Sequence, residues 1–380
     1  MTSDACDKAV GSATGDVRRR YLAGLIVLVA AAALIRVAVL HARPVWDDER
    51  HTIALAGMTP AEIVRSLSTD VHPPLYFHVV RWWGRAFGVS AESLRGFSAV
   101  CGMAILPALL FAGRSLVGRE AALAACLLTS FSPIHIHYSA EARSYAFVEL
   151  LVLFSTLATV RLSREPNWQW AVAYVATMSA ALYTHYWCAF VVITDNVYWI
   201  LFVRPLADRR WRFWIGAQVA VAITLLPWIV VMPGQLSAGH GDWIDPPPLD
   251  APLKTLFRFT TGWDFLLRTN IVRAIEAVLF VPYLVVLAAG AKRSPDGDRA
   301  RATEGADLAF FCAAPILAGY VFSLLGKPMY VIGRFDVIVF PIFALLFGRG
   351  FMQIGRGAQR IALSAVGISC VLYLSFVLRP

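Results

Sequence analysis

The chain has 380 residues, of which 58% are hydrophobic and only 16% are charged, whereas soluble domains carry roughly 25% charged residues. This composition excludes an ordinary soluble globular protein. The formal net charge of +9 is spread between apolar runs instead of forming one basic patch with exposed aromatics, so it does not indicate nucleic-acid binding.

Apolar stretches of about 20 residues recur along nearly the whole chain, and each can cross a hydrocarbon layer about 30 Å thick. We therefore predict an all-α polytopic membrane protein, with residues 1–20 as a cytoplasmic tail and residues 21–380 as a single transmembrane domain. The first apolar run is too long for a cleaved signal peptide. About eleven spanning helices are expected: Tyr21–Leu40, Leu94–Gly113, Ala121–Ser132, Ala146–Leu162, Trp168–Thr184, Trp187–Val203, Phe213–Val231, Asn270–Gly290, Ala306–Leu325, Val331–Phe347 and Ile361–Leu378.

The segment Val71–Gly88 is also apolar, but cationic and histidine side chains recur along it at helical spacing. We predict an amphipathic helix that lies in the membrane interface instead of crossing it. With this choice about 19 of the 34 Lys and Arg residues fall on the cytoplasmic side, whereas a spanning segment would reverse the bias. The N-terminus is then inside and the C-terminus outside.

This topology leaves two long external loops, residues 41–93 and 232–269, and short basic cytoplasmic connections. All 8 histidines fall on the outer side or at outer helix ends. Histidine is a common acid-base, phosphate and metal residue, so chemistry is expected on the external face. Tolerance of polar groups at one interface is the alternative explanation.

The first external loop begins with three adjacent carboxylates, Asp47, Asp48 and Glu49. Mutual repulsion raises the pKa of at least one of them unless cations compensate, and such a carboxylate can act as a general base. The alternative interpretation is an acidic cap for a helix over Glu49–Gly57.

Later in the same loop, Asp70 and His72 precede two prolines that fix an extended backbone. They are expected beside the acidic cluster, where they would hold a polar substrate or a divalent cation. Their spacing fits no standard zinc pattern, so metal binding stays open. A simple helix N-terminus with an Asp cap is the alternative.

Residues 132–145 form a polar cassette between two spans, which is rarely accidental. Arg143 offers a bidentate fork for a phosphate, although it can instead pair with Glu141. Further polar groups at outer helix ends and inside spans are also candidates, as is a Gly- and Pro-rich lid at residues 239–248. They are His137, Tyr138, Tyr145, His185, Lys327, Arg334, Glu149, Asp195 and Glu276. Glu149, Asp195 and Glu276 can equally form hydrogen bonds between helices.

The order of these elements resembles a known family. A first span, an Asp-Glu pair, Asp-Val-His-Pro-Pro-Leu at 70–75, an interfacial helix and Ser-Pro-x-His-x-x-Tyr-Ser-x-Glu-Ala-Arg-x-Tyr-Ala at 132–146 follow one another. Together they resemble the polytopic lipid-dependent glycosyltransferases of the GT-C fold. The closest likeness is to family 39, which contains protein O-mannosyltransferases and the aminoarabinose transferase of lipid A modification. It covers roughly residues 21 to 350.

The resemblance implies that Asp48 is the catalytic carboxylate with Glu49 in support, and the neighbouring Asp47 is the other candidate for the base. It also implies that Asp70, His72 and Arg143 line the substrate cavity, and that Arg334 stands where the family often has an Arg-Tyr pair. Phe335 replaces the tyrosine here. The family often has a soluble C-terminal domain. If this protein does not have such a domain, recognition of the acceptor is expected from the loops or from a partner protein.

The implied reaction transfers a sugar from a polyprenyl phosphate to an acceptor hydroxyl with inversion at the anomeric carbon. Expected partners are the lipid-linked donor, a glycolipid, polysaccharide or protein acceptor, and the lipid bilayer, but no nucleic acid. The expected location is a bacterial inner membrane, with the site on the periplasmic face. The main alternative is a transporter or flippase of lipid-linked sugars, which should show paired inverted repeats with interrupted helices; none is evident. An assembly subunit is a third interpretation, which would not need these polar residues together.

Overall fold

The computed structural model describes residues 3–203, 208–237, 244–262, 270–292 and 305–379, and these residues contain helices and no strand. In chain order the helices are α1 (Ser3–Ala42), α2 (Asp47–Gly57), α3 (Pro60–Leu67), α4 (Leu75–Phe87), α5 (Ala91–Leu116), α6 (Arg119–Phe131), α7 (Pro133–Ser139), α8 (Tyr145–Arg164), α9 (Trp168–Leu182), α10 (Cys188–Phe202), α11 (Arg210–Ile229), α12 (Met232–Ser237), α13 (Ala251–Thr261), α14 (Asn270–Ala291), α15 (Gly305–Leu325), η1 (Asp336–Val339), α16 (Phe340–Gln353) and α17 (Arg356–Val377).

The predicted spanning segments correspond to the long helices of one bundle. All eleven coincide with a helix, namely α1, α5, α6, α8, α9, α10, α11, α14, α15, α16 and α17. Within the described residues, eight spans are long and apolar enough to cross a membrane, and α6, α9 and α10 are shorter, with 13, 15 and 15 residues. The chain is therefore an integral membrane protein of the predicted all-α class.

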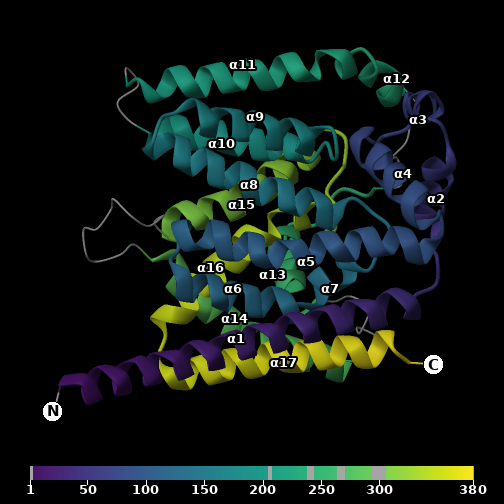
Figure 1. Ribbon diagram of the computed structural model, residues 1–380. Helices are drawn as coiled ribbons and strands as arrows, with labels where there is room; N and C mark the ends of the chain where they lie inside the picture. The colour runs from purple at the N-terminus through teal and green to yellow at the C-terminus, as the bar shows by residue number, and fades with distance from the viewer. Residues whose placement is uncertain (1–2, 204–207, 238–243, 263–269, 293–304, 380) are drawn as a thin grey trace.

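Short helices gather at one end of this bundle. Figure 1 shows α2, α3, α4 and α12 at the end where α1 finishes, opposite the end where α1 begins; α17 finishes at the same end as these short helices. The start of α1 and the end of α17 thus lie at opposite ends of the bundle, which is consistent with the predicted topology, in which the N-terminus is inside and the C-terminus outside.

The helix α4 belongs to this end and not to the bundle itself. It packs on α2 and α5 and lies with the other short helices at one end of the bundle. Trp82 and Phe87 on its surface are 66% and 65% exposed, and Arg85 lies over the Trp82 ring. An aromatic and cationic face of this kind suits a membrane interface, and the interfacial position of α4 stays a prediction.

The centre of the bundle is α16, which is buried along most of its length and packs on α6, α14 and α15. Close approach depends on small residues at the contacts. A Cβ atom at Gly348 would lie 2.0 Å from the carbonyl oxygen of Ala121 in α6, so only glycine fits there.

The predicted span Val331–Phe347 was wrong at its start. The helical segment begins only at Asp336, and residues 331–335 form a turn in which Gly333 has a φ of +61°. The apolar character of Val331 and Ile332 concealed this turn. Part of the second external loop is also more ordered than expected, because α13 lies within it and packs on α7, α14, α15 and α17.

Candidate functional site

The three adjacent carboxylates Asp47, Asp48 and Glu49 all lie in the first turn of α2. Successive helical side chains point about 100° apart, and each of the three has a different environment. The Asp47 side chain is 88% exposed and pairs with Arg50 at 2.7 Å, whereas the Asp48 side chain is 33% exposed and Glu49 is 1% exposed.

Glu49 is tied to the scaffold. Arg95 of α5 donates from Nε to Glu49 Oε1 at 2.8 Å and from Nη2 to Oε2 at 2.6 Å, and the backbone N–H of Ala142 donates to Oε1 at 2.9 Å. Burial alone would raise the pKa of Glu49, but these donors hold it below its usual value. The remaining Arg95 donors bind backbone carbonyls of residues 40, 43 and 44. Glu49 therefore joins α2, α5 and the end of α1.

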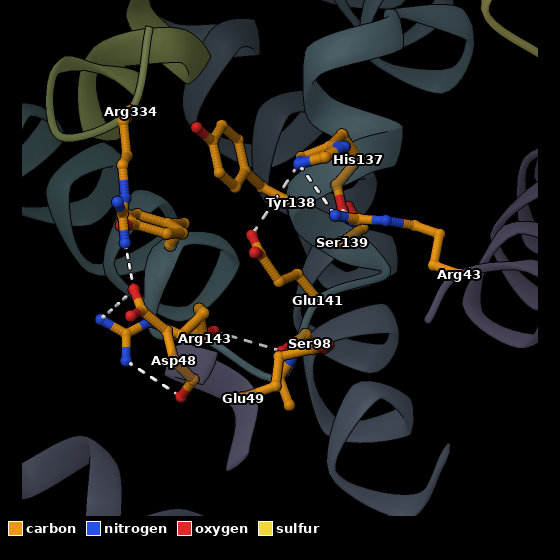
Figure 2. A network of polar contacts seen from close by, with 12 residues as sticks. Arg43, Asp48, Glu49, Ser98, His137, Tyr138, Ser139, Glu141, Arg143 and Arg334 are labelled. Atoms are coloured by element: carbon orange, nitrogen blue, oxygen red, sulfur yellow. Dashed lines mark hydrogen bonds and ion pairs between the residues drawn. The ribbon is translucent and has the colours of Figure 1, made fainter. Parts of the chain in front are cut away.

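Asp48 instead lies between two arginines from distant parts of the sequence. Its Oδ2 atom pairs with the guanidinium of Arg334 and lies 3.6 Å from Nη2 of Arg143. Figure 2 shows the Asp48 carboxylate between these two side chains, with Glu49 away from Arg334. The structure thus separates the two neighbouring aspartates: Asp48 meets the cations and Asp47 faces away from them.

The turn at residues 331–335 presents Arg334 to Asp48. Asp336 Oδ2 accepts from the Gly333 N–H at 3.1 Å, and Tyr138 donates its hydroxyl to the Gly333 carbonyl at 2.8 Å. Arg334 Nε donates to the Tyr145 hydroxyl at 2.9 Å, and the guanidinium lies 5.0 Å from the centre of the Trp46 ring. Asp336 therefore shapes the turn that carries Arg334.

A cavity of about 840 Å³ opens beside the ion pair of Asp48 and Arg334. Four arginines face it together with aromatic side chains and a single carboxylate, so its wall is strongly cationic. The lining residues are Ala42, Arg43, Pro44, Trp46, His137, Tyr138, Glu141, Arg258, Val331, Arg334, Tyr373, Phe376, Val377 and Arg379. The wall thus combines the end of α1, α7, α13, the turn before η1 and the end of α17.

The carboxylate in this wall, Glu141, is only 2% exposed. Its Oε2 atom has no hydrogen-bond partner among the described residues and lies 4.0 Å from His137 Nε2. Burial raises the pKa of Glu141, although the charges of Arg43 and Arg143 oppose the shift. Figure 2 shows Glu141 between the His137 side and the Asp48 side of the site. Glu141 and Arg143 do not form the direct pair that was the alternative interpretation, since Arg143 binds Asp48 and His72.

The Asp70 and His72 pair lies on the other side of Arg143. His72 Nδ1 is 2.7 Å from Asp70 Oδ1, and its Nε2 accepts from Arg143 Nη2 at 2.9 Å. Burial and the Arg143 charge lower the pKa of His72. His51 adds a contact that the sequence did not indicate, with Nε2 2.8 Å from Asp70 Oδ2. Burial would raise the pKa of Asp70, but the two histidines hold it far below its usual range.

His185 completes the aromatic side of the site. Its ring packs near Tyr145 and Phe335, with centroids 6.0 and 5.3 Å apart. Burial, reinforced by His72 and Arg143, lowers the pKa of His185 to about 3, so the ring is neutral at physiological pH.

Other predicted site residues lie elsewhere. Lys327 is exposed after α15 and does not line the cavity. Asp195 accepts from the Tyr174 hydroxyl between helices at 3.2 Å, and Glu149 lies 3.4 Å from His135. Glu276 is buried in α14. Residues 239–243 of the predicted lid, including His240, lie outside the described residues.

Sequence reasoning missed several residues that build the site, namely Arg43, Trp46, His51, Arg95, Arg258, Tyr373 and Arg379. Arg95 offered the clearest signal, because a charged residue in a buried helix face requires a partner of opposite charge. The others come together only through long-range packing.

Comparison with known proteins agrees with the fold. A family model described as dolichyl-phosphate-mannose-protein mannosyltransferase matches residues 71–230. The ArnT structure from Cupriavidus metallidurans in the apo state is 16% identical, with a TM-score of 0.62, and the match covers 90% of this chain and 62% of that one. The ArnT structure bound to undecaprenyl phosphate gives 15% identity, a TM-score of 0.60, and 93% and 65% coverage.

A more distant likeness links the chain to an archaeal oligosaccharyltransferase. AglB from Archaeoglobus fulgidus, in complex with an inhibitory peptide and a dolichol-phosphate, is 12% identical with a TM-score of 0.55, covering 93% of this chain and 55% of that one. The search of curated proteins gives no match. The chain thus has the GT-C fold and spans less than two thirds of the length of the ArnT structures.

Proposed function

We propose that this protein is an inverting glycosyltransferase that moves a sugar from a polyprenyl phosphate to an acceptor hydroxyl, with Asp48 as general base. The observation that carries the proposal is the position of Asp48. It is the partly exposed carboxylate of its cluster that lies against two arginines beside a cationic cavity. The matched family description and the undecaprenyl phosphate bound to ArnT support a lipid-phosphate donor.

The cavity suits the phosphate of such a donor. Arg43, Arg258, Arg334 and Arg379 line it, and planar guanidinium groups bind phosphate oxygens through paired donors. Its wall reaches the end of α17, where Phe376 and Val377 supply an apolar border. A lipid tail can follow this border while the phosphate stays among the arginines.

Charge development in the reaction fits the same groups. The acceptor oxygen forms a bond to the anomeric carbon as the bond from that carbon to the phosphate oxygen breaks, and the acceptor proton passes to Asp48. The leaving polyprenyl phosphate takes the electron pair, so its negative charge grows where Arg334 and Arg143 can stabilise it. One displacement of this kind inverts the anomeric centre.

The arginines also give Asp48 two states. In the structure they pair with the carboxylate, and a bound phosphate would compete for the same guanidinium groups. Asp48 is then released to accept a proton when the leaving group is in place. This order links base activation to donor binding.

We assign this end of the bundle to the outer face of the membrane, on the periplasmic side of a bacterial inner membrane, and the positive-inside count supports this assignment. The acceptor, whether glycolipid, polysaccharide or protein, would approach from that side, where Asp48 is accessible.

The test compares the full chain in lipid nanodiscs with its Asp48→Asn variant, using a panel of radiolabelled polyprenyl-phosphate sugars. We expect transfer or sugar release to fall by roughly 100-fold or more, the usual contribution of a general base. The matched control is Asp47→Asn, the same substitution at the exposed neighbour, which should retain the wild-type rate.

Three other results would contradict the proposal in different ways. Loss of transfer in Asp47→Asn with normal transfer in Asp48→Asn would move the base to Asp47. Equal rates in all three proteins would remove both aspartates from the chemistry. A folded wild type that turns over no donor but moves lipid-linked sugar between leaflets would be a transporter.

A further inference from the structure

A second cluster of ionisable side chains lies beside Arg143, which contacts Asp48, and has no part in the proposed transfer step. It consists of His51 on α2 with Asp70 and His72 on the segment between α3 and α4. One ligand atom from each side chain can be chosen so that all three atoms lie within 4.8 Å of one another. The side chains are 35%, 19% and 26% exposed, so solutes can reach them.

The cluster is held by its surroundings. Phe77 of α4 packs edge-on against both imidazoles, with ring centroids 5.9 Å from His51 and 5.8 Å from His72. Gln235 of α12 donates from Nε2 to the carbonyls of Leu67 and His72, at 2.7 and 3.3 Å, and so fixes both ends of the segment. A site whose side chains are locked by packing and outer hydrogen bonds is prepared for a ligand.

Two imidazole nitrogens and one carboxylate oxygen are the donor set of open zinc sites, in which water or another ligand takes the remaining position. Related divalent transition ions also bind such sets, whereas Mg²⁺ and Ca²⁺ prefer oxygen ligands alone. The mixed donors therefore select the zinc class of ions.

We propose that His51, Asp70 and His72 form a binding site for a divalent ion of the zinc class, and that the bound ion releases Arg143 from His72. The first part stands on the cluster alone. The effect on substrate binding rests on the proposed function.

The coupling follows from the two nitrogens of His72. Arginine only donates, so Nε2 accepts from Arg143 at 2.9 Å and the ring proton is on Nδ1, which lies 2.7 Å from Asp70. An ion bound to Nδ1 displaces that proton, and the neutral ring then carries its proton on Nε2. Two donors would face each other, and the hydrogen bond from Arg143 is lost.

Arg143 also lies against Asp48, 3.6 Å from its carboxylate and 3.4 Å from its carbonyl oxygen. Release from His72 makes its Nη2 donors available for a phosphate in the adjoining site. Ion and lipid phosphate should therefore each strengthen binding of the other, since linkage is reciprocal.

The first experiment measures zinc binding to the full chain in nanodiscs, after removal of polyhistidine tags and treatment with chelator, by competition with a chromophoric chelator. We expect one Zn²⁺ per chain, and at least 100-fold weaker binding in His51→Gln and in Asp70→Asn. The matched control is His78→Gln on α4, which should bind as the wild type. Elution profile and thermal midpoint verify that each variant is folded. Stoichiometric binding that survives in His51→Gln, or no binding by the wild type, would overturn the site.

The second experiment measures binding of polyprenyl phosphate, without sugar or acceptor, in the presence and absence of Zn²⁺. We expect about 5-fold tighter binding with the ion in the wild type, the same factor for Zn²⁺ when the lipid is present, and no change in His51→Gln. Zinc binding with unchanged lipid affinity would overturn the coupling. Neither result depends on transfer, so failure of the proposed function in the Asp48 test is seen separately.

Discussion

Asp48 and Glu49 are neighbours on one helical turn, yet their surroundings differ in burial and in how firmly their hydrogen-bond partners are held. Glu49 is sealed with Arg95, and both of its oxygens accept hydrogen bonds from fixed donors. Asp48 is partly exposed and contacts Arg143 and Arg334. Arg334 lines a cavity together with Glu141, one oxygen of which is buried without a hydrogen-bond partner among the described residues. The first pair holds elements together, whereas the second is arranged so that its partners can be exchanged for a ligand.

The largest effect that separates the two regions should come from Arg95→Ala. Removing one partner of a buried ion pair leaves an uncompensated charge, which costs about 3–5 kcal/mol. We expect a corresponding fall in stability, measured by chemical or thermal unfolding in detergent. The matched control is Arg50→Ala, which removes the exposed partner of Asp47 and should cost less than about 1 kcal/mol. Equal losses in both variants would show that the Glu49 pair is not a structural tie.

The next effect concerns transfer instead of stability. Arg334→Gln removes the cation closest to Asp48, and loss of one donor to developing charge typically lowers the rate by about 100–1000-fold, or about 3–4 kcal/mol. The measurement is the transfer rate at saturating donor in nanodiscs. Arg85→Gln, on the exposed face of α4, is the control and should not change the rate. A normal rate in Arg334→Gln would place charge stabilisation elsewhere in the cavity.

The sequence predicts the bundle well because apolar runs of spanning length are a local property of the chain. It does not predict which of Asp47 and Asp48 meets the cations. That choice depends on which face of α2 packs on α4 and α5. The helix also begins at Asp47, and not at Glu49 as the helix alternative assumed. One residue of phase turns a side chain by about 100°, and an acidic run carries no signal for it.

The sequence also does not predict the partners of Asp48 and Glu49, for a related reason. Arg95 is 46 residues from Glu49 and Arg334 is 286 residues from Asp48. Such contacts depend on how helices pack, and hydropathy does not record packing. The turn before η1 was missed because Val331 and Ile332 extend an apolar run. The Asp336 carboxylate that accepts from the Gly333 N–H within the turn is buried and also bonded by Thr255, 81 residues away, and hydropathy does not indicate that contact.

A smaller effect should appear as a pH dependence of stability. His185 has a folded-state pKa of about 3 against an ordinary value of 6.5, so the unfolded chain binds the proton first as the pH falls. Stability therefore decreases below about pH 6.5, and by at most about 1.4 kcal/mol between pH 7.5 and 5.5. In His185→Gln this contribution should vanish and the curve should flatten over that range. His41→Gln, at the exposed end of α1, is the control; an unchanged slope in His185→Gln would contradict the assignment.

The smallest effect tests whether the contact between Trp46 and Arg334 contributes to binding of the lipid phosphate. The Arg334 guanidinium lies 5.0 Å from the Trp46 ring centre, and such contacts contribute roughly 0.5–2 kcal/mol depending on exposure. Trp46→Leu keeps an apolar side chain but removes the ring, so we expect polyprenyl phosphate to bind about 2- to 30-fold more weakly, the same energy expressed as an affinity ratio. Trp82→Leu, an exposed tryptophan on α4, serves as the matched control. If the two variants bind the lipid equally well, Trp46 is only part of the wall. If only Trp46→Leu binds the lipid more weakly, the Trp46 ring orients Arg334 toward the phosphate. The side chains around Asp48 are then preorganised, as those around Glu49 are.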